Sequence, residues 1–217
     1  MKKMLFYLMM ITPFFVHAQF GFKAGLNFAK VSKSSDINFN SSNRSGFHGG
    51  IFLAPPSKKI ISSRTEILFS RQGYNYKTST NTGNVNMDYL TQSQFMCINI
   101  TKFVQLQFGA QTAILLSAQA DSSTSTGGTA NPYGKIMDYY NRFDYGYALG
   151  AEIHPVAGLI IGARYNVSLA KVYKDIQSAQ KPSFTSEDAK NNVVQVSVGW
   201  RFGGKKDKKS KEDKEEE

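Results

Sequence analysis

The 217-residue sequence is poor in cysteine, because Cys97 is the only one. A single cysteine excludes an internal disulfide framework, a cysteine-based zinc site and a dithiol redox pair. Charged residues make up 19% of the chain, below the roughly 25% of typical soluble domains. After residue 18 no apolar run approaches the about 18 residues that indicate a transmembrane helix. Aromatic residues, at 13%, argue against disorder.

The first eighteen residues are typical of an export signal. Met1–Lys3 is basic, residues 4–16 are almost entirely apolar, and Ala18 closes a short segment that suits signal peptidase. We therefore expect residues 1–18 to be a signal peptide cleaved between Ala18 and Gln19. The apolar run of about 13 residues is too short for a membrane-spanning helix, which needs about 20. The residue directly after the expected cleavage site is Gln19 and not a cysteine, so a lipoprotein anchor is not expected.

Period-two alternation of apolar and polar residues recurs eight times in the remaining chain. In residues 20–28, for example, Phe20, Phe22 and Leu26 lie on one side of the pleat, opposite Lys23 and Asn27. The fourth segment is the weakest, because polar glutamines sit among mixed neighbours there. The predicted strands are residues 20–28, 47–53, 64–70, 88–100, 104–117, 143–153, 159–169 and 194–202.

The connections between these strands alternate in length. We expect long, Ser/Thr/Asn/Gly/Lys-rich connections near residues 33–45, 73–87, 119–140 and 171–190, and short ones near 55–59, 101–103 and 155–158. Strict alternation of long and short connections is typical of an up-and-down antiparallel barrel with two unlike rims. The sequence therefore predicts an all-β fold, an eight-stranded antiparallel up-and-down transmembrane β-barrel, over residues 19–202. An even strand number places both termini at the short-turn rim, which we expect to be periplasmic.

The chemistry of the two strand faces favours a membrane barrel over a soluble one. One face is large and apolar, and the other mixes Gly, Gln, Asn, Ser and both signs of charge. The interior of an eight-stranded barrel is too narrow for the face that carries the large apolar side chains. Lipid can cover that face instead, and a closed barrel pairs every backbone group within the membrane. Aromatics near the strand ends match interfacial girdles; they are Phe20, Phe22, Trp200 and Phe202 at one rim, and Tyr74, Tyr89, Phe143 and Tyr145 at the other. A secreted or periplasmic, lipocalin-like barrel that binds a small ligand stays as the alternative.

Several segments resemble the outer-membrane β-barrel domain family of Bacteroidota, often called PorT-like. The segments that carry the resemblance are residues 22–27, 66–73, 143–152, 162–166 and 196–202. The resemblance implies an eight-stranded outer-membrane barrel, and one branch of the family is linked to the type IX secretion and gliding apparatus. Two features depart from the family: residues 89–94 are polar where an apolar stretch with proline is common, and fifteen residues follow the expected terminal aromatic Phe202.

Charged residues on the lumen side form the main candidate site. We expect them to pair with one another and plug the barrel, because an unpaired buried charge costs several kcal/mol. A proton or ion pathway is the alternative, although eight strands enclose no aqueous channel. The expected network consists of Lys23, Arg64, Glu66, Asp144, Glu152, Arg164 and Arg201.

An enzyme that modifies lipid A is the remaining, less favoured alternative. After the signal peptide the chain has only His48 and His154 as imidazole bases, and no neighbouring motif singles out a nucleophilic serine. Cys97 is expected to be a packed small hydrophobe. We therefore expect no catalytic residues, no cofactor and no metal.

The remaining charge pattern bears on partners. Residues 203–217 contain six Lys and six acidic residues, so this tail is neutral and is expected to be disordered in the periplasm, where it could contact peptidoglycan or a protein. Lysines in or beside the long connections (Lys77, Lys135, Lys171, Lys174 and Lys181) favour contact with anionic lipopolysaccharide. The expected partners are outer-membrane lipids, lipopolysaccharide and an outer-membrane or periplasmic protein, and no nucleic acid. The working hypothesis is a non-enzymatic structural or interaction protein.

Overall fold

The computed structural model is built almost entirely from strands, and it describes residues 19–31, 40–55, 60–77, 81–124, 131–135, 137–174 and 189–202. The expected signal peptide and charged tail lie outside the described residues. The strands are β1 (Gln19–Val31), β2 (Asn40–Ala54), β3 (Ile61–Lys77), β4 (Asn81–Asn99), β5 (Val104–Thr124), β6 (Asn131–Lys135), β7 (Phe143–Ile153), β8 (Leu159–Ser168) and β9 (Asn191–Arg201). A single 3-10 turn, η2 (Met137–Tyr139), is the only helical element among the described residues.

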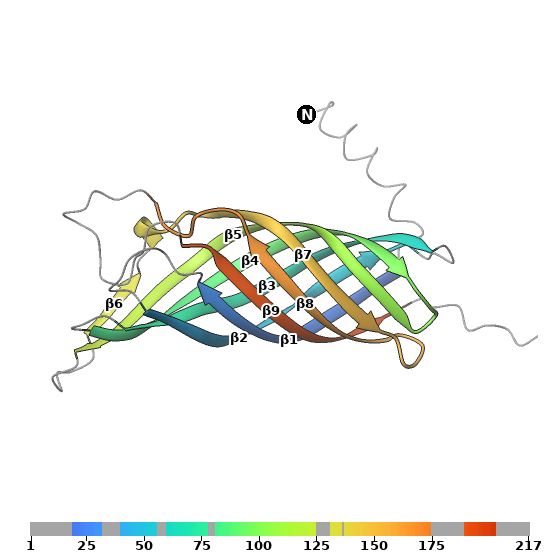
Figure 1. Cartoon of the computed structure of the whole chain (residues 1–217), viewed down its shortest axis with the longest axis horizontal. Coiled ribbons are helices and arrows are strands. Elements are labelled where there is room, and N and C mark those ends of the chain that lie inside the picture. The colour runs from blue at the N-terminus through green and yellow to red at the C-terminus, as the bar shows by residue number, and fades with distance from the viewer. Residues whose placement is uncertain are drawn as a thin grey trace, which may run out of the picture.

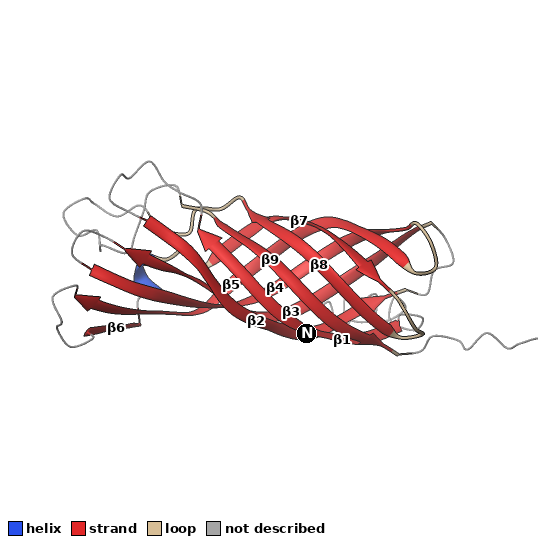
Figure 2. Cartoon of the chain, turned by 60° about the horizontal axis from the view of Figure 1, so that its bottom comes forward, coloured by secondary structure: helices blue, strands red, loops and turns tan. Residues whose placement is uncertain are grey.

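Eight of the strands close into an antiparallel barrel (Figures 1 and 2). The hydrogen-bonded order is β4-β3-β2-β1-β9-β8-β7-β5, and β4 pairs with β5 to complete the ring. The short β6 pairs only with the end of β5, so it lies outside the ring. The predicted fold class is therefore confirmed. None of the helical residues described could cross a membrane, since no helix is long and apolar enough.

The pleat separates the two faces as the alternation predicts. In β1, Phe22 and Leu26 are 49% and 55% exposed on the outer wall, whereas Lys23 and Asn27 are 3% and 0% exposed in the interior. Most of the ring divides in the same way, so that the wall is mainly apolar and most of the buried charged and amide side chains face the interior. We call the outward-facing hydrophobic residues of the wall the apolar belt; representative members are Phe22, Ile51, Ile67, Leu90, Phe108, Leu149, Ile161 and Val198.

The two ends of the barrel differ, as Figure 1 shows. One end carries the tight connections of residues 100–103 and 154–158, and Gly158 adopts a positive φ of 94° in the second of them. The described chain also begins and ends there, where the rings of Phe20 and Phe202 stack 6.2 Å apart. The other end carries β6 and the long connections. We refer to them as the short-turn end and the long-connection end.

The connection predicted near residues 73–87 is instead mostly strand. β3 continues to Lys77 and β4 starts at Asn81, and the two pair in register up to Lys77 and Thr82. β2 and β5 also run past their predicted limits, so that a sheet projects beyond the apolar belt at the long-connection end (Figure 2). We call it the extension sheet; it comprises residues 40–43, 72–77, 81–89 and 117–124. The sequence of the extension sheet resembles that of a connection, because its outer face lies beyond the apolar belt and carries polar residues.

Candidate functional site: the filled interior of the barrel

Five charged side chains meet in the interior of the barrel. Lys23 Nζ lies 2.9 Å from Glu66 Oε1 and 2.7 Å from Glu152 Oε1. Arg64 Nη1 lies 2.6 Å from Glu152 Oε2, and Arg164 Nη1 donates to Glu66 Oε2 at 2.8 Å. All five are at most 7% exposed. Since they come from β1, β3, β7 and β8, the network ties distant strands together across the barrel.

Neutral groups also contact the two arginines, although Arg64 Nε has no hydrogen-bond partner among the described residues. Arg64 Nη2 donates to Gln105 Oε1 at 2.9 Å, and Arg164 donates through Nε and Nη2 to Gln195 Oε1 at 3.1 and 2.9 Å. The Arg64 guanidinium lies 4.9 Å from the ring centre of Phe52. Each cation is thus desolvated but partnered, which is the condition under which a buried charge is tolerated.

Two members of the predicted network lie elsewhere. Asp144 accepts a hydrogen bond from the Ser168 hydroxyl nearer the long-connection end and forms no ion pair with any described residue. Arg201 borders a small hollow at the short-turn end with Arg64 and Gln105, and it too has no ion pair among the described residues. The structure thus brings together five of the seven predicted charges, because Asp144 and Arg201 sit near opposite ends of their strands.

A neutral polar layer follows the charge network toward the long-connection end. Asn27 is its centre: its side-chain nitrogen donates to Ser70 Oγ at 2.9 Å, and its oxygen accepts from Gln195 at 2.9 Å and lies 2.8 Å from His48 Nδ1. His48 is 2% exposed and its described partner is this amide, not a serine. His154 lies at the short-turn end, 3.7 Å from Glu152. No hydrogen bond joins either histidine to a hydroxyl group among the described residues, although Ser70 lies opposite His48 where β2 pairs with β3.

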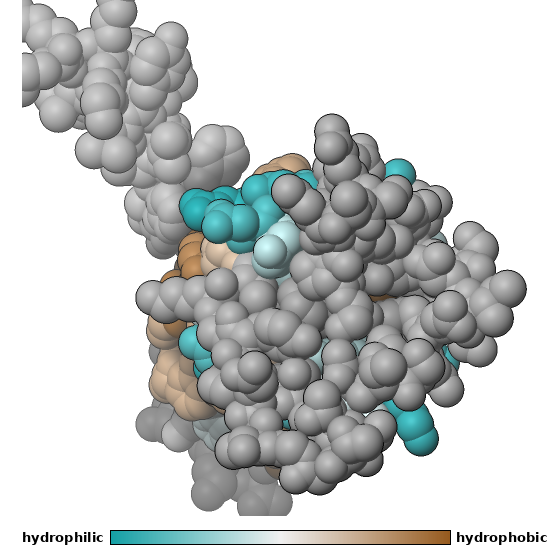
Figure 3. All heavy atoms as spheres, turned by 90° about the vertical axis from the view of Figure 1, so that its left-hand side faces the viewer, coloured by the Kyte–Doolittle hydropathy of each residue, from teal (hydrophilic) through white to brown (hydrophobic). Residues whose placement is uncertain are grey.

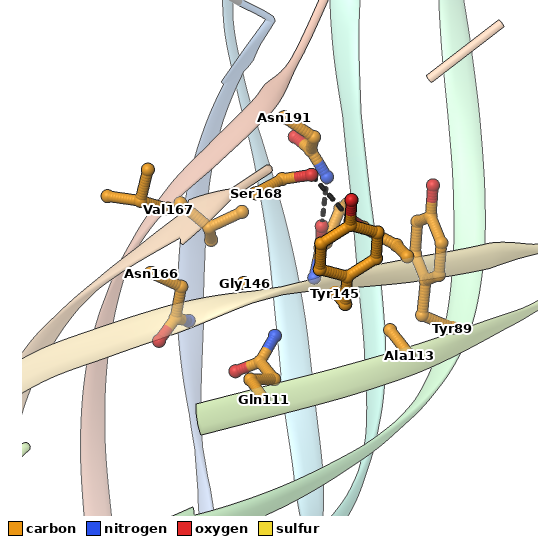
Figure 4. A pocket seen from close by; sticks show the side chains of 12 residues that line it. Tyr89, Gln111, Ala113, Tyr145, Gly146, Asn166, Val167, Ser168 and Asn191 are labelled. Atoms are coloured by element: carbon orange, nitrogen blue, oxygen red, sulfur yellow. Dashed lines mark hydrogen bonds between the residues drawn. The ribbon is translucent and has the colours of Figure 1, made fainter. Parts of the chain in front are cut away.

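A small polar cavity lies on the side of this layer that faces the long-connection end (Figure 4). Its volume is about 20 Å³, far below the roughly 300 Å³ at which pockets for small molecules begin. Both amide atoms of Asn166 lack a hydrogen-bond partner among the described residues, and Figure 4 shows this side chain beside Gln111. Space of this size suits one or two water molecules held by polar groups. It does not suit the apolar ligand of a lipocalin-like barrel.

Tyrosines close the long-connection end. The hydroxyl of Tyr74 hydrogen-bonds those of Tyr140, at 2.9 Å, and Tyr173. All three side chains are at most 5% exposed, and they pack with Val85 and Met87 in the largest apolar cluster of the described chain. Burial raises the pKa of the Tyr140 and Tyr173 hydroxyls above their usual range, so both remain neutral. The cluster fixes residues 137–141 and 171–174 against the inner face of the extension sheet.

The aromatic residues divide between the wall and the interior. Phe20, Phe22, Tyr145, Trp200 and Phe202 are 43%, 49%, 51%, 39% and 47% exposed on the outer wall. Tyr74 and Tyr89, expected at the lipid interface, point inward instead and are 0% and 3% exposed; that expectation is wrong. In the extension sheet, apolar side chains face inward because residues 137–141 and 171–174 cover that side. Figure 3, a view onto the long-connection end, shows part of the hydrophobic wall beside hydrophilic residues at the rim.

Sequence reasoning missed the tyrosine cluster and the stacking of arginine on phenylalanine. Tyr140 and Tyr173 come from predicted connections, and their pairing through an isolated β-bridge has no signal in the alternation. The arginine–aromatic contacts, such as Arg164 at 4.7 Å from the ring centre of Phe95, depend on which strands meet across the lumen. Among the described residues no group of three or more His, Cys, Asp or Glu side chains could hold a metal ion.

A closed antiparallel barrel with an apolar wall, a charged and filled interior and two unlike ends defines the class of outer-membrane β-barrel proteins. The chain belongs to the outer membrane protein beta-barrel domain family, whose sequence profile matches residues 16–174. The protein is accordingly placed in the bacterial outer membrane. No protein of curated function matches the chain.

The chain is also similar to solved structures at low sequence identity. The attachment invasion locus protein Ail of Yersinia pestis is 16% identical and has a TM-score of 0.47, and the match covers 86% of this chain and 100% of Ail. Neisserial surface protein A is 18% identical with a TM-score of 0.46, over 84% of this chain and 97% of that one. OprG of Pseudomonas aeruginosa is 8% identical with a TM-score of 0.43, over 86% and 97%.

Proposed function

We propose that this protein is a non-enzymatic outer-membrane barrel that acts by contact, through the long-connection end, with other molecules at the cell surface. The observation that carries the proposal is the filled interior. Ion pairs among Lys23, Arg64, Glu66, Glu152 and Arg164 close the lumen at one level, and the tyrosine cluster closes it at another. A barrel filled in this way has no path for solutes and supports a rigid rim, which is where contacts with partners concentrate.

Conductance across a planar lipid bilayer tests the filled interior. Purified wild-type barrel, inserted in the folded, heat-modifiable form, should produce no unitary current steps. A general porin with an open aqueous channel, recorded in the same bilayer set-up, provides the positive control. Stable steps from the wild-type barrel would show an open pathway and would refute the proposal in favour of ion or proton conduction.

The proposal includes an orientation, with the long-connection end outside the cell and both termini in the periplasm. Lys77 and Lys102 form a matched pair for this test, since both are exposed and they lie at opposite ends of the barrel. We expect Lys77→Cys to react with a membrane-impermeant maleimide on intact cells, and Lys102→Cys to react only after the outer membrane is permeabilised. The reverse pattern would contradict the orientation. Lys77, Lys171 and Lys174, which are exposed near the long connections, would then face the anionic lipopolysaccharide headgroups.

The finer proposal is a place in a secretion or gliding assembly of the PorT, or type IX, kind. Its support is the resemblance of the chain to the PorT-like family of outer-membrane barrels, one branch of which is linked to that apparatus, together with a rim that is built as a folded surface. The extension sheet is backed by a hydrophobic cluster that includes Tyr74 and Val85, so it can hold one shape in the absence of lipid. Co-purification from native outer membranes tests this membership directly.

A further inference from the structure

A polar patch interrupts the apolar belt on one side of the barrel. Gln92 and Gln94 of β4 both point outward and are exposed. Thr65 on β3 donates to Gln94 Oε1 at 2.6 Å, and Thr112 on β5 donates to Gln92 Oε1 at 3.2 Å. These four side chains form what we call the amide patch. It spans three neighbouring strands, so it is a feature of the assembled wall and not of one segment.

The strand register places the amide patch at the middle depth of the belt. Thr65 pairs with Gln94, and Gln92 pairs with Thr112. Hydrophobic residues bracket these rows on both sides. Toward the long-connection end the next row is Phe69, Leu90 and Ile114, and toward the short-turn end the row formed by Ile61, Ile98 and Leu106 lies beyond Ser63, Met96 and Phe108. The glutamines therefore face the hydrocarbon region and not the headgroups.

The side-chain N–H donors of the amide patch lack partners within the described chain. Each glutamine carbonyl accepts one threonine hydroxyl, but no described residue accepts a hydrogen bond from the side-chain nitrogen of Gln92 or Gln94. Each nitrogen carries two N–H donors, and lipid tails offer no acceptor, so such exposure is costly. On β9, in contrast, the outward positions Val194, Val196, Val198 and Trp200 are all hydrocarbon or aromatic.

We propose that the amide patch is the interface through which two copies of this chain associate side by side within the membrane. Two copies that are inserted in the same direction and meet through the same surface are related by a two-fold axis along the membrane normal, which brings each residue near its own counterpart at the same depth. A charged side chain cannot pair with its own copy, whereas a carboxamide both donates and accepts. Gln92 and Gln94 are therefore self-complementary, and their free N–H groups find acceptors on the second copy.

The surroundings of the patch allow close approach. A shallow groove of about 640 Å³ adjoins it on the outer wall; the small Ser63 and Gly109 border it beside Gln94, and the larger Ile61, Met96 and Phe108 complete its edge. Ala110, which pairs with Gln94 on β5, is also small. Small residues let membrane-embedded segments come near enough for interhelical or interstrand hydrogen bonds, so the second copy can reach the amides.

Cysteine cross-linking in native outer membranes tests the proposal on the full-length protein. Gln92→Cys and Gln94→Cys, made separately, should give a disulfide-linked dimer on mild oxidation. Val196→Cys is the matched control, because it is outward-facing and 44% exposed on β9, four strands away around the ring from β4. The wild type serves as the blank, since Cys97 is 1% exposed and faces inward.

A second measurement separates association from folding. The double variant Gln92→Leu/Gln94→Leu should keep heat-modifiable gel migration, while its dimer dissociation constant in lipid nanodiscs or mild detergent rises about tenfold. Dimers in the wild type that weaken in this variant support the proposal. Three results would overturn it: monomers only from both cysteine variants, equal cross-linking at Val196→Cys, or cross-links from the patch to a different protein.

Discussion

Replacing Glu66 by its neutral isostere tests how much the buried charge network contributes to stability. Glu66 is 0% exposed and lies within 4 Å of three cations: Lys23 at 2.9 Å, Arg164 at 2.8 Å and Arg64 at 3.6 Å. In Glu66→Gln, Lys23 and Arg64 share one carboxylate, that of Glu152, and Arg164 is left with no ion pair to a described residue. Breaking a buried pair from one side typically costs about 3–5 kcal/mol, because the remaining charge is left uncompensated. We expect a loss of free energy of unfolding in that range.

The matched control is an ion pair on the outer face. Arg71 donates to Asp88 at 2.7 and 2.8 Å, but the Arg71 side chain is 44% exposed. Asp88→Asn should therefore cost only about 0–1 kcal/mol. Both variants can be unfolded with guanidinium in detergent micelles while the fluorescence of the single tryptophan, Trp200, is followed. A Glu66→Gln loss no larger than that of Asp88→Asn would refute the network as a source of stability.

A double-mutant cycle sharpens this test. Lys23 binds both Glu66 and Glu152, so Glu66→Gln leaves this lysine with one carboxylate. Adding Lys23→Met then removes the cation that Glu66→Gln has left partly unpaired. The double variant should be more stable than the sum of the single losses predicts, with a coupling of about 0.5–3 kcal/mol. Strict additivity would show that the two side chains act independently.

Three further predictions concern other parts of the wall and interior. Tyr173→Phe removes a buried hydroxyl of the tyrosine cluster, so it should speed hydrogen exchange in residues 137–141 and 171–174, whereas the exposed Tyr165→Phe should not; equal exchange would contradict the cluster's role. Gly50→Ala should reduce the folded, heat-modifiable fraction because its Cβ would overlap a β3 carbonyl, but Gly49→Ala, with its nearest neighbours 3.9 Å away, should be tolerated; equal folding would count against the packing. Trp200 should be quenched more strongly by lipids brominated near the headgroup than near the chain end, as its place at the short-turn rim requires; the opposite order would place it too deep.

The alternation in the sequence predicted the eight barrel strands because the membrane imposes it. Lipid requires hydrophobic residues at every second position, as in residues 20–28, and the narrow interior requires small or polar residues between them. Lys23 and Glu66 were identified as inward-facing from this period alone. Their pairing was not predictable, because contacts between β1, β3, β7 and β8 depend on the register around the ring.

The extension sheet could not be recognised by the same rule. Beyond the belt the outer face meets no lipid, so polar Asn, Thr and Ser occupy positions that would otherwise be apolar. A register shift between Asp88 and Tyr89, opposite Leu115 and Ser117, also changes the phase of β5 relative to β4. Tyr74 and Tyr89 therefore looked like interfacial aromatics, although they form part of the interior. Gln92 and Gln94 weakened the fourth strand in sequence because they are polar residues on the lipid side.

Purification of a tagged copy from native outer membranes in mild detergent, with co-purifying proteins identified by mass spectrometry, tests most directly whether the protein acts by contact. The account predicts that the barrel is recovered with further outer-membrane or periplasmic proteins of a secretion or gliding assembly. Recovery of this chain with no other protein, as one copy or two, would contradict that role.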